Sequence, residues 1–346
     1  MEPKVGFDLE SIRKIETVYS HASCYDGTAA AIICAFAFKR LGIDPKFEFI
    51  QYDSSEQLNL IPKPNCLFID ITPSLLSIDQ WLPFKPLILD HHETAKPAVE
   101  SLQGIFGLNS RFESGANLAY NFIYKPIEFQ YGGSDECDEC DGSGTYKLDG
   151  EICKCICSEE QEVDPISRFA HLCAIRDTWQ DKHEDWEAAQ YVCHGLDLYS
   201  NQELLEKIQD GSYGPNDLVV LSDIGSRLYR KILRKSKAVA QTAFITTINY
   251  QQQAIKVAIF NCTEKIISET CHLLLNEYGC QLAISYFTNF NYNEFQTVVS
   301  LRSNTLKVNE IAQRFGGGGH QGAAGYRIKS LPESAIPTFI LKSISD

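Results

Sequence analysis

The sequence contains no apolar run long enough to cross a bilayer, which excludes a protein built on membrane-spanning helices. Its first residues, Met1-Glu2-Pro3-Lys4, lack the basic and then apolar pattern of a secretory signal peptide. Basic residues are also scarce, and the formal net charge is −14. We therefore expect a cytoplasmic protein that binds no membrane and no long duplex DNA, because holding a nucleic-acid backbone requires a basic surface.

Disulfide frameworks are also not expected, although the chain has 13 cysteines. Their number is odd and they are scattered, so in a reducing compartment they would be small buried hydrophobes or metal ligands. The acidic charge favours small or short substrates. If the substrate is a phosphate compound, bound cations must supply much of the local positive charge. A length of 346 residues makes two domains the default expectation.

Short apolar runs alternate with helical segments through the first half of the chain. The alternation predicts an α/β fold, a doubly wound and mainly parallel sheet with helices on both faces. Strands are expected at Glu16–Ser20, Lys46–Tyr52, Cys66–Ile69 and Pro86–Leu89, and helices at Thr28–Leu41 and Leu75–Trp81.

Polar residues with metal-binding side chains follow three of these strands. His21, Asp70 and Asp90-His91-His92 stand at strand ends, and Asp26 comes a few residues after the first of them. Parallel sheets bind ligands beyond the carboxyl ends of their strands. A single aspartate at a strand end is more often a helix cap or a turn residue. Metal-binding side chains at the ends of three successive strands, however, indicate a functional site. Two adjacent histidines fill a core poorly, because each ring needs partners for two nitrogens. The pair is chemically reasonable if the first histidine is a metal ligand and the second a proton donor or phosphate contact.

Two further segments could contribute to this site. An apolar segment ends at Asp177 beside Trp179, although Asp177 could instead pair with Arg176 or cap the following segment. Ser114 precedes a helix-like stretch at Ala116–Tyr124. Capping of that helix is the favoured role of Ser114, and phosphate binding at the helix start is the alternative.

The Asp90-His91-His92 triplet, the strand-end Asp70 and the loop from His21 to Asp26-Gly27 resemble the DHH phosphoesterase superfamily. That group includes single-strand exonucleases, nano-RNases, cyclic-dinucleotide phosphodiesterases, exopolyphosphatases and manganese-dependent pyrophosphatases. The resemblance implies two divalent cations, usually Mn²⁺ with Mg²⁺ or Zn²⁺ as alternatives, bridged by Asp70. It further implies the following roles: His21 binds the first ion; Asp26, His91 and Asp177 bind the second; Asp90 orients the histidines; His92 contacts the phosphate or leaving group.

Cys24 departs from the commoner family pattern. That pattern is H-x-x-x-D-x-D, whereas this chain has His21-x-x-Cys24-x-Asp26, which resembles the H-x-x-C-x-D-G form of one branch. A thiolate ligand would favour a softer ion such as Zn²⁺ over Mn²⁺. The alternative is that Cys24 is not a ligand.

A cysteine-rich insert at residues 131–162 predicts one structural Zn²⁺. Five cysteines compete for four positions, namely Cys137, Cys140, Cys153, Cys155 and Cys157. Locally the segment resembles the C-x-x-C-x-G-x-G knuckle of chaperone-type zinc modules. The alternatives are a free cysteine-rich loop or a lobe that docks a partner or gates substrate.

The second half predicts helices at Asp185–Gln209 and Ser222–Ala240 and then a smaller α/β domain. We divide the chain into a metal-binding domain at 1–212, a connecting helix at 213–240 and a substrate-binding domain at 241–346. In the last domain, strands are expected at 243–250, 254–260, 281–286 and 295–301, and helices near 264–278 and 308–314.

A glycine run, Gly316 to Gly319, precedes His320 near the end of the chain. Several glycines together let main-chain N–H groups approach a ligand, and an arginine fork suits phosphate. The run and the following Gln-Gly-Ala-Ala-Gly resemble the DHH-associated C-terminal domain. This resemblance implies that the loop and a preceding arginine hold the nucleotide or phosphate end of the substrate. The candidate residues are Arg302, Ser303, Gly317, Gly318, Gly319 and His320.

The sequence thus predicts a metal-dependent phosphodiesterase that hydrolyses short oligonucleotides or dinucleotides by two-metal activation of water, in a cleft between the domains. One alternative is hydrolysis of polyphosphate or pyrophosphate by the same ions. Another is a degenerate, non-catalytic nucleotide sensor in which Cys24 disables the first metal position. The sequence is silent on oligomeric state and leaves a homodimer open.

Overall fold

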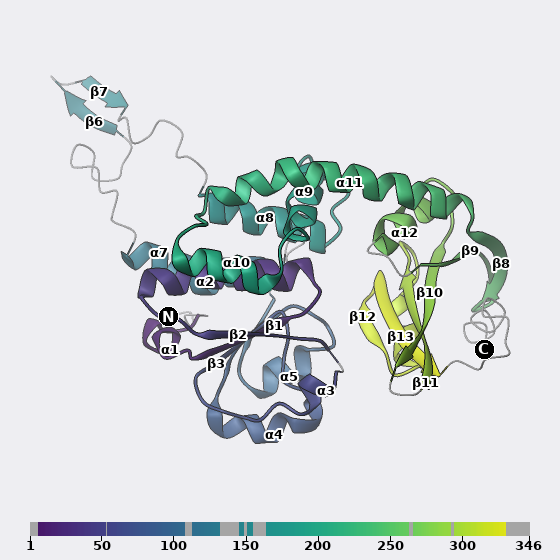
Figure 1. Ribbon diagram of the computed structural model, residues 1–346, viewed down its shortest axis with the longest axis horizontal. Coiled ribbons are helices and arrows are strands. Elements are labelled where there is room, and N and C mark those ends of the chain that lie inside the picture. The colour runs from purple at the N-terminus through teal and green to yellow at the C-terminus, as the bar shows by residue number, and fades with distance from the viewer. Residues whose placement is uncertain are drawn as a thin grey trace. The chain divides into compact units, whose positions relative to one another are not determined.

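The computed structural model describes residues 6–52, 54–107, 113–131, 145–148, 151–154, 164–262, 266–291 and 294–329 (Figure 1). The chain divides into two compact units. The first is Met1–His91 with Ala95–Ser226, and the second is His92–Thr94 with Arg227–Asp346. No helix within the described ranges is both long and apolar enough to span a membrane. The expected active-site cleft between the two domains depends on how the units are placed relative to one another, and it stays a prediction.

A five-stranded parallel sheet forms the centre of the first unit, as expected. Its strand order is β2-β1-β3-β4-β5, and every neighbouring pair is parallel. The carboxyl ends of β1, β3 and β4 therefore meet at one edge. The strands are β1 (Thr17–His21), β2 (Lys46–Ile50), β3 (Cys66–Ile69), β4 (Leu87–Asp90) and β5 (Ile105–Phe106).

Helices surround this sheet. Before the insert they are α1 (Leu9–Arg13), α2 (Tyr25–Leu41), α3 (Ser55–Leu58), α4 (Ile78–Trp81), α5 (Lys96–Ser101), α6 (Gly115–Ala119) and α7 (Lys125–Tyr131), with 3₁₀ turns at Leu75–Ser77 and Leu82–Phe84 and a π turn at Tyr120–Tyr124. After the insert they are α8 (Pro165–Asp177), α9 (Trp186–Leu196), α10 (Asn201–Asp210) and α11 (Asp217–Gln241).

Both faces of the sheet are covered because successive strand residues point to opposite sides. In β3, Leu67 and Ile69 join the core that contains α2, α6, α8 and α9, whereas Phe68 joins the core that contains Trp81 of α4 and Val99 of α5. Continuous apolar strands of this kind are typical of a sheet that is buried on both faces.

The predicted helices are present, with two differences of detail. The helical stretch expected at Asp185–Gln209 is two helices, α9 and α10. Ser200 caps α10, because its hydroxyl accepts a hydrogen bond from the Glu203 N–H. The helix expected at Leu75–Trp81 is a 3₁₀ turn followed by the single turn α4.

The second unit is built on a mixed six-stranded sheet of order β12-β13-β11-β10-β9-β8. β9 and β10 are parallel and the other neighbours are antiparallel. Leu274 of α12 packs on one face and Ile311 of α13 on the other. The elements are β8 (Phe244–Tyr250), β9 (Gln253–Asn261), α12 (Ile267–Asn276), β10 (Leu282–Asn291), β11 (Glu294–Arg302), α13 (Val308–Gln313), β12 (Gly318–His320) and β13 (Ala323–Lys329).

The glycine run was expected as a ligand-binding loop, but its last residues form the edge strand β12. A Cβ on Gly317 would lie 2.1 Å from the Gly325 carbonyl oxygen, and one on Gly319 would lie 2.6 Å from the Ala323 oxygen. Gly319 also has φ +130°. These two glycines therefore permit close pairing with β13.

Within the cysteine-rich insert, the structure describes one antiparallel hairpin, β6 (Thr145–Leu148) with β7 (Glu151–Lys154). Cys137, Cys140, Cys155 and Cys157 lie outside the described residues, and for Cys153 only the strand position is described. The zinc prediction therefore stays a prediction.

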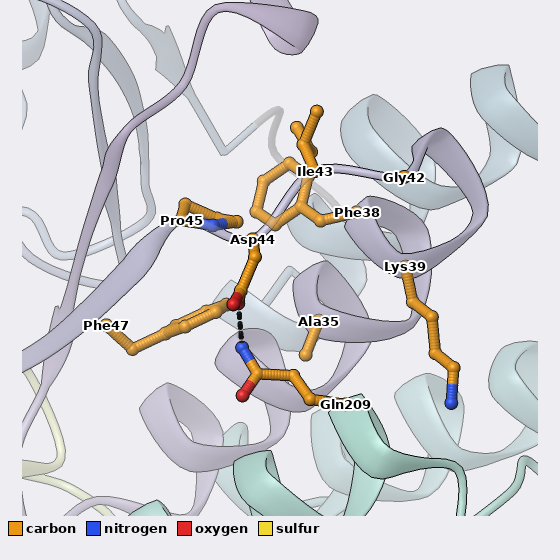
Figure 2. Close-up of a pocket in the computed structure, with 9 residues that line it drawn as sticks. All are labelled: Ala35, Phe38, Lys39, Gly42, Ile43, Asp44, Pro45, Phe47 and Gln209. Carbon is orange, nitrogen blue, oxygen red and sulfur yellow. Dashed lines mark hydrogen bonds between the residues drawn. The ribbon is translucent and has the colours of Figure 1, made fainter.

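A cavity of about 210 Å³ lies in the first unit, beside the C-terminal end of α2 (Figure 2). Phe38 and Phe47 form apolar walls, and Gln209 of α10 donates a hydrogen bond to Asp44 at its edge. Of the predicted site residues that the structure describes, none lines this cavity.

Close contact between α9 and α11 gives a test of the first unit's packing. A Cβ on Gly225 would lie 1.7 Å from the Tyr191 carbonyl oxygen, so Gly225→Ala must push the helices apart. Although alanine favours helix, we expect a loss of about 1–3 kcal/mol in unfolding free energy, measured by urea denaturation. Gly214→Ala, next to the start of α11, would meet only Asp217 at 3.7 Å and is the control. Equal stability of Gly225→Ala and wild type would contradict this packing.

Candidate metal centre

His21 and Asp26 flank a tight strand-to-helix connection. His21 ends β1, and Asp26 lies in the first turn of α2. A Cβ on Gly27 would lie 2.4 Å from the His21 carbonyl oxygen. The glycine that follows Asp26 is thus required for packing, because any side chain there would push α2 away from the end of β1.

Asp70 directly follows β3 in an uncommon backbone conformation. Its φ is +58°, and the residue is fully buried. The Asp70 N–H donates to the Leu89 carbonyl oxygen at 2.9 Å, which holds the turn against β4. Oδ2 of Asp70 lies 3.4 Å from Nδ1 of His21. Left-handed residues other than glycine are often found at functional sites, and here the conformation brings Asp70 to His21.

Asp90 ends β4 and is fully buried, and His91 follows it. The hydroxyl of Tyr52, beyond the end of β2, donates a hydrogen bond to the Asp90 carboxylate. Tyr52 also packs edge-on against the His21 ring, at 5.3 Å between ring centroids. One tyrosine therefore contacts residues at the ends of both β1 and β4.

Three carboxylates converge on one imidazole. Nε2 of His91 lies 3.2 Å from Oδ1 of Asp70, 3.5 Å from Oδ2 of Asp26 and 3.6 Å from Oδ2 of Asp177, the last residue of α8. Asp26, Asp70 and His91 each offer a ligand atom within 4.8 Å of the others. The structure thus brings together four residues that the sequence places far apart.

The N-terminus of α6 binds a carboxylate of the protein itself. Both the Gly115 and the Ala116 N–H groups donate to Asp26, the latter at 2.9 Å. The Ser114 hydroxyl caps the helix by accepting from the Asn117 N–H at 3.2 Å, as favoured from the sequence. A Cβ on Gly115 would lie 2.6 Å from the Asp70 Cβ, so glycine lets the helix start approach both aspartates. The alternative role of this helix start, phosphate binding, is replaced by Asp26 binding.

The electrostatics of the cluster favour a cation. Burial, and then the charges of Asp177 and Asp70, raise the pKa of Asp26 well above its usual value. Burial alone would lower the pKa of His91, but the hydrogen bond to Asp70 and the three carboxylates raise it well above its usual value. Three carboxylates that meet at one imidazole repel one another, and a bound cation or proton relieves this repulsion. Such charge in a buried site is costly unless a metal ion or proton balances it.

Cys24 is the N-cap residue of α2 and lies close enough to the cluster to respond to its charge. Burial and then the carboxylates of Asp70, Asp177 and Asp26 raise the pKa of its thiol. Among the described residues, no compact group of three ligand atoms includes Cys24. Its role as a ligand stays a prediction.

Asp177 is placed by a helix, where the sequence indicated only an apolar segment. The neighbouring Arg176 is buried, and its guanidinium lies 4.4 Å from the centre of the Trp179 ring and 5.8 Å from that of Tyr25. The guanidinium thus stacks between aromatic rings, while the Asp177 carboxylate lies against His91.

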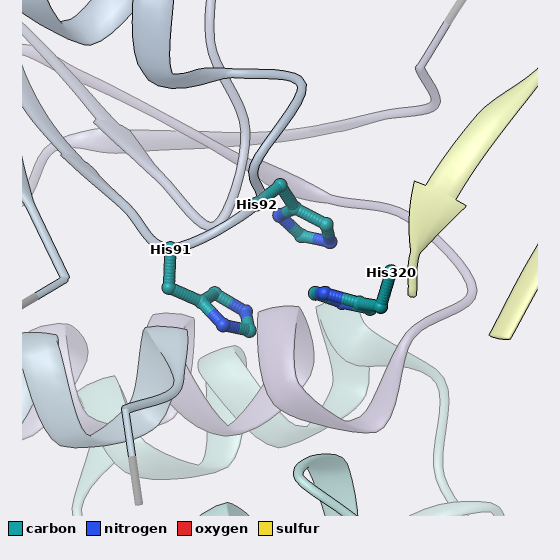
Figure 3. Close-up of side chains that lie close together, drawn as sticks. All are labelled: His91, His92 and His320. Carbon is teal, nitrogen blue, oxygen red and sulfur yellow. The ribbon is translucent and has the colours of Figure 1, made fainter. Parts of the chain in front are cut away.

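In the second unit, which includes His92–Thr94, the rings of His92 and His320 are stacked with centroids 4.9 Å apart (Figure 3). Glu93 accepts hydrogen bonds from Asn309 at 3.4 Å and Gln321 at 3.5 Å. His92 therefore contacts a histidine that the sequence assigned to substrate binding and that lies far along the chain.

The other residues predicted to bind substrate lie at one end of the mixed sheet. Arg302 ends β11, and its guanidinium donates to the Leu301 carbonyl oxygen at 2.9 Å. The buried Ser303 hydroxyl donates to the Gln281 oxygen and accepts from the N–H groups of Thr305 and Leu306. Ser303 thus organises a turn. Gly318 lies between Gly317 and Gly319 in the run that pairs with β13.

Sequence reasoning did not assign Tyr52, Glu93 or the Gly115 and Ala116 N–H groups to the site. Tyr52 closes the predicted strand at Lys46–Tyr52, so its place at a strand end was an available signal. Main-chain donors have no residue-type signature, and only the three-dimensional arrangement reveals them.

Comparisons with known proteins support part of this interpretation. Residues 251–345 match the model of the DHHA1 domain. No curated protein matches the sequence. Among solved structures, RecJ of Thermus thermophilus in complex with Mn²⁺ is 14% identical with a TM-score of 0.50, over 99% of this chain and 55% of the RecJ chain.

Two other solved structures are more weakly similar. An exopolyphosphatase-related protein of Bacteroides fragilis is 11% identical with a TM-score of 0.49, over 97% of this chain and 93% of that one. The pGpG-specific phosphodiesterase PggH of Vibrio cholerae is 13% identical with a TM-score of 0.43, over 95% and 98%. Residues 251–345 thus match a DHHA1 domain model, and the fold is similar to that of RecJ, which confirms the expected α/β fold class.

The raised pKa values predict that Mn²⁺ binds more tightly as the pH rises. The pKa of Asp26 is raised above its usual 3.8 and the pKa of His91 above its usual 6.5. Below these raised pKa values an entering ion must displace protons from both groups. Each displaced proton makes the apparent affinity rise about tenfold per pH unit until the pH exceeds the raised pKa. The same shifts stabilise the metal-free protein at low pH, and this stability is lost as the pH rises through the folded-state pKa values.

Calorimetric titration with Mn²⁺ at a series of pH values from acidic to alkaline measures this slope. Asp26→Asn should have a smaller slope, whereas Asp79→Asn, at an exposed position of α4, should leave it unchanged. An Mn²⁺ affinity independent of pH in the wild type would contradict the charge analysis.

Proposed function

We propose that this protein is a DHH-superfamily phosphoesterase that uses divalent cations, Mn²⁺ in the first place, to hydrolyse phosphodiester bonds of short oligonucleotides or dinucleotides. The observation that carries the proposal is the convergence of Asp26, Asp70 and Asp177 on His91. The DHHA1 match and the fold shared with an Mn²⁺-bound RecJ support it.

The donor set fits divalent cations. Carboxylate and imidazole groups suit Mn²⁺ and Zn²⁺, and the excess negative charge of the cluster would be balanced by them. When bound, such ions neutralise phosphoryl oxygens and make water a better nucleophile. Asp70 would bridge two ions, because its two oxygens face His21 and His91 separately. His21 would hold one ion, and Asp26, His91 and Asp177 the other.

The remaining residues of the β4 end would position these ligands. Asp90, held by Tyr52, would fix the direction in which the chain leaves the strand and so orient His91. His92 would contact the phosphate or the leaving oxygen. These are separate tasks for three consecutive residues.

Residues of the second unit would hold the distal part of the substrate. Arg302 offers a guanidinium suited to phosphate, and His320 stacks on His92. A nucleotide makes better use of a second binding domain than pyrophosphate does. The net charge of −14 favours a short substrate, because a long polyanion would be repelled.

Asp70→Asn tests the proposed cation site. Replacing the shared carboxylate with an amide should lower Mn²⁺-dependent kcat/KM on a short RNA or linear dinucleotide by at least about 10³-fold. Asp79→Asn is the matched control and should behave as wild type. The substrate panel should include short DNA, cyclic dinucleotides and polyphosphate. Full activity in Asp70→Asn would exclude this site, and turnover of polyphosphate alone would exclude the phosphodiester assignment.

Arg302→Gln tests the role of the second unit. Loss of a charge-assisted contact to a non-reacting part of the substrate should raise KM about tenfold or more and leave kcat nearly unchanged. Steady-state kinetics separate the two constants. Arg314→Gln, at an exposed position after α13, is the control. An unchanged KM in Arg302→Gln would remove Arg302 from substrate binding.

A further inference from the structure

A second group of metal-ligating side chains lies between α8 and α9. His171 comes from α8, and His183 and Asp185 come from the segment that leads into α9. Oδ2 of Asp185 lies 3.9 Å from Nε2 of His171 and 3.8 Å from Nδ1 of His183. The two rings meet edge to face with centroids 5.4 Å apart. None of these residues belongs to the candidate metal centre described above.

The Asp185 carboxylate points away from the helix backbone that an N-cap aspartate normally contacts. Asp185 is the N-cap residue of α9, where aspartate normally accepts a hydrogen bond from the helix backbone. In the described chain its carboxylate makes no such cap bond. It lies instead between the two imidazoles and Arg168.

Arg168 acts as a clamp on this carboxylate. Its guanidinium donates to both oxygens of Asp185, at 2.8 Å to Oδ2 and 2.5 Å to Oδ1. Each carboxylate oxygen has two lone pairs. Because Arg168 uses one lone pair of Oδ2, the other remains available on the side that faces the histidines. Outer hydrogen bonds of this kind orient the carboxylate ligands of metal sites.

We propose that His171, His183 and Asp185 form a second, independent cation site that takes one Zn²⁺ or a similar imidazole-preferring ion. In a tetrahedral zinc site, neighbouring ligand atoms are about 3.4 Å apart, so the two measured separations need to contract by about 0.5 Å. The Asp185 N–H donates to Nδ1 of His183 at 3.1 Å, and the ion replaces this bond. The side chains are 38%, 24% and 22% exposed, which leaves the fourth position open to water.

The site would connect the α8 helix to the start of α9 across residues 178–185. This segment follows Asp177 directly. The ion would therefore fix the part of the chain that comes immediately after a candidate active-site acid. Two imidazoles and one carboxylate favour Zn²⁺ over Mn²⁺, in contrast to the carboxylate-rich candidate centre. The two sites are therefore expected to differ in metal preference.

Counting bound zinc in matched variants of the full-length protein tests this site. Wild type, His171→Gln, His183→Gln and the control His272→Gln are saturated with Zn²⁺, dialysed and analysed for metal. Any other zinc-binding site is the same in all four proteins. A difference in bound zinc therefore reports only on the substituted histidine. We expect one equivalent fewer in His171→Gln and in His183→Gln than in wild type and His272→Gln.

Thermal unfolding with and without Zn²⁺ gives an independent readout. The zinc-dependent rise in Tm should be smaller in both variants than in wild type, by at least about 3 °C at saturating metal. Retention of the wild-type zinc content and Tm rise in either His171→Gln or His183→Gln would overturn the proposal. The group would then be a hydrogen-bonded cluster only. Both histidines are partly exposed, so both variants are expected to fold.

Discussion

The first unit depends on one costly arrangement, three carboxylates around the imidazole of His91. Asp26 and Asp70 are 1% and 0% exposed, so water cannot balance their charges. Asp26, Asp70 and Asp177 all lie within 3.6 Å of the same imidazole nitrogen, so their charges repel one another. Burying such charge without compensation costs several kcal/mol per ion. The protein therefore carries an arrangement that stabilises the fold only when protons or cations are present, as expected for a binding site rather than a structural core.

Main-chain geometry, more than side-chain identity, makes this arrangement possible. Asp70 adopts a left-handed conformation that turns the chain at the end of β3. Gly27 lets α2 start against His21, and Gly115 lets the start of α6 reach both buried aspartates. The N–H groups of that helix start then bind Asp26. The start of α6 thus partly offsets the charge of the Asp26 carboxylate and fixes its orientation.

Much of the fold and part of the site could be predicted from the sequence, for identifiable reasons. β3 was predicted to the residue because apolar Cys66–Ile69 is bounded by Asn65 and Asp70, and the common edge of β1, β3 and β4 followed from their parallel order. The break between α9 and α10 was missed because polar and leucine residues continue through it, and the nearby Gly195 lies inside α9 rather than in the break. The edge strand β12 was missed because a glycine that admits a neighbouring strand has the same sequence signature as one that admits a substrate.

Crystallography with Mn²⁺ is the sharpest test of whether the His91 cluster binds a cation. Anomalous scattering from a crystal soaked with Mn²⁺ locates the ion without reference to activity or substrate. We expect an anomalous peak within about 2.3 Å of oxygens of Asp26 and Asp70 and of Nε2 of His91. An ordered cluster with no peak at saturating Mn²⁺ would contradict this expectation.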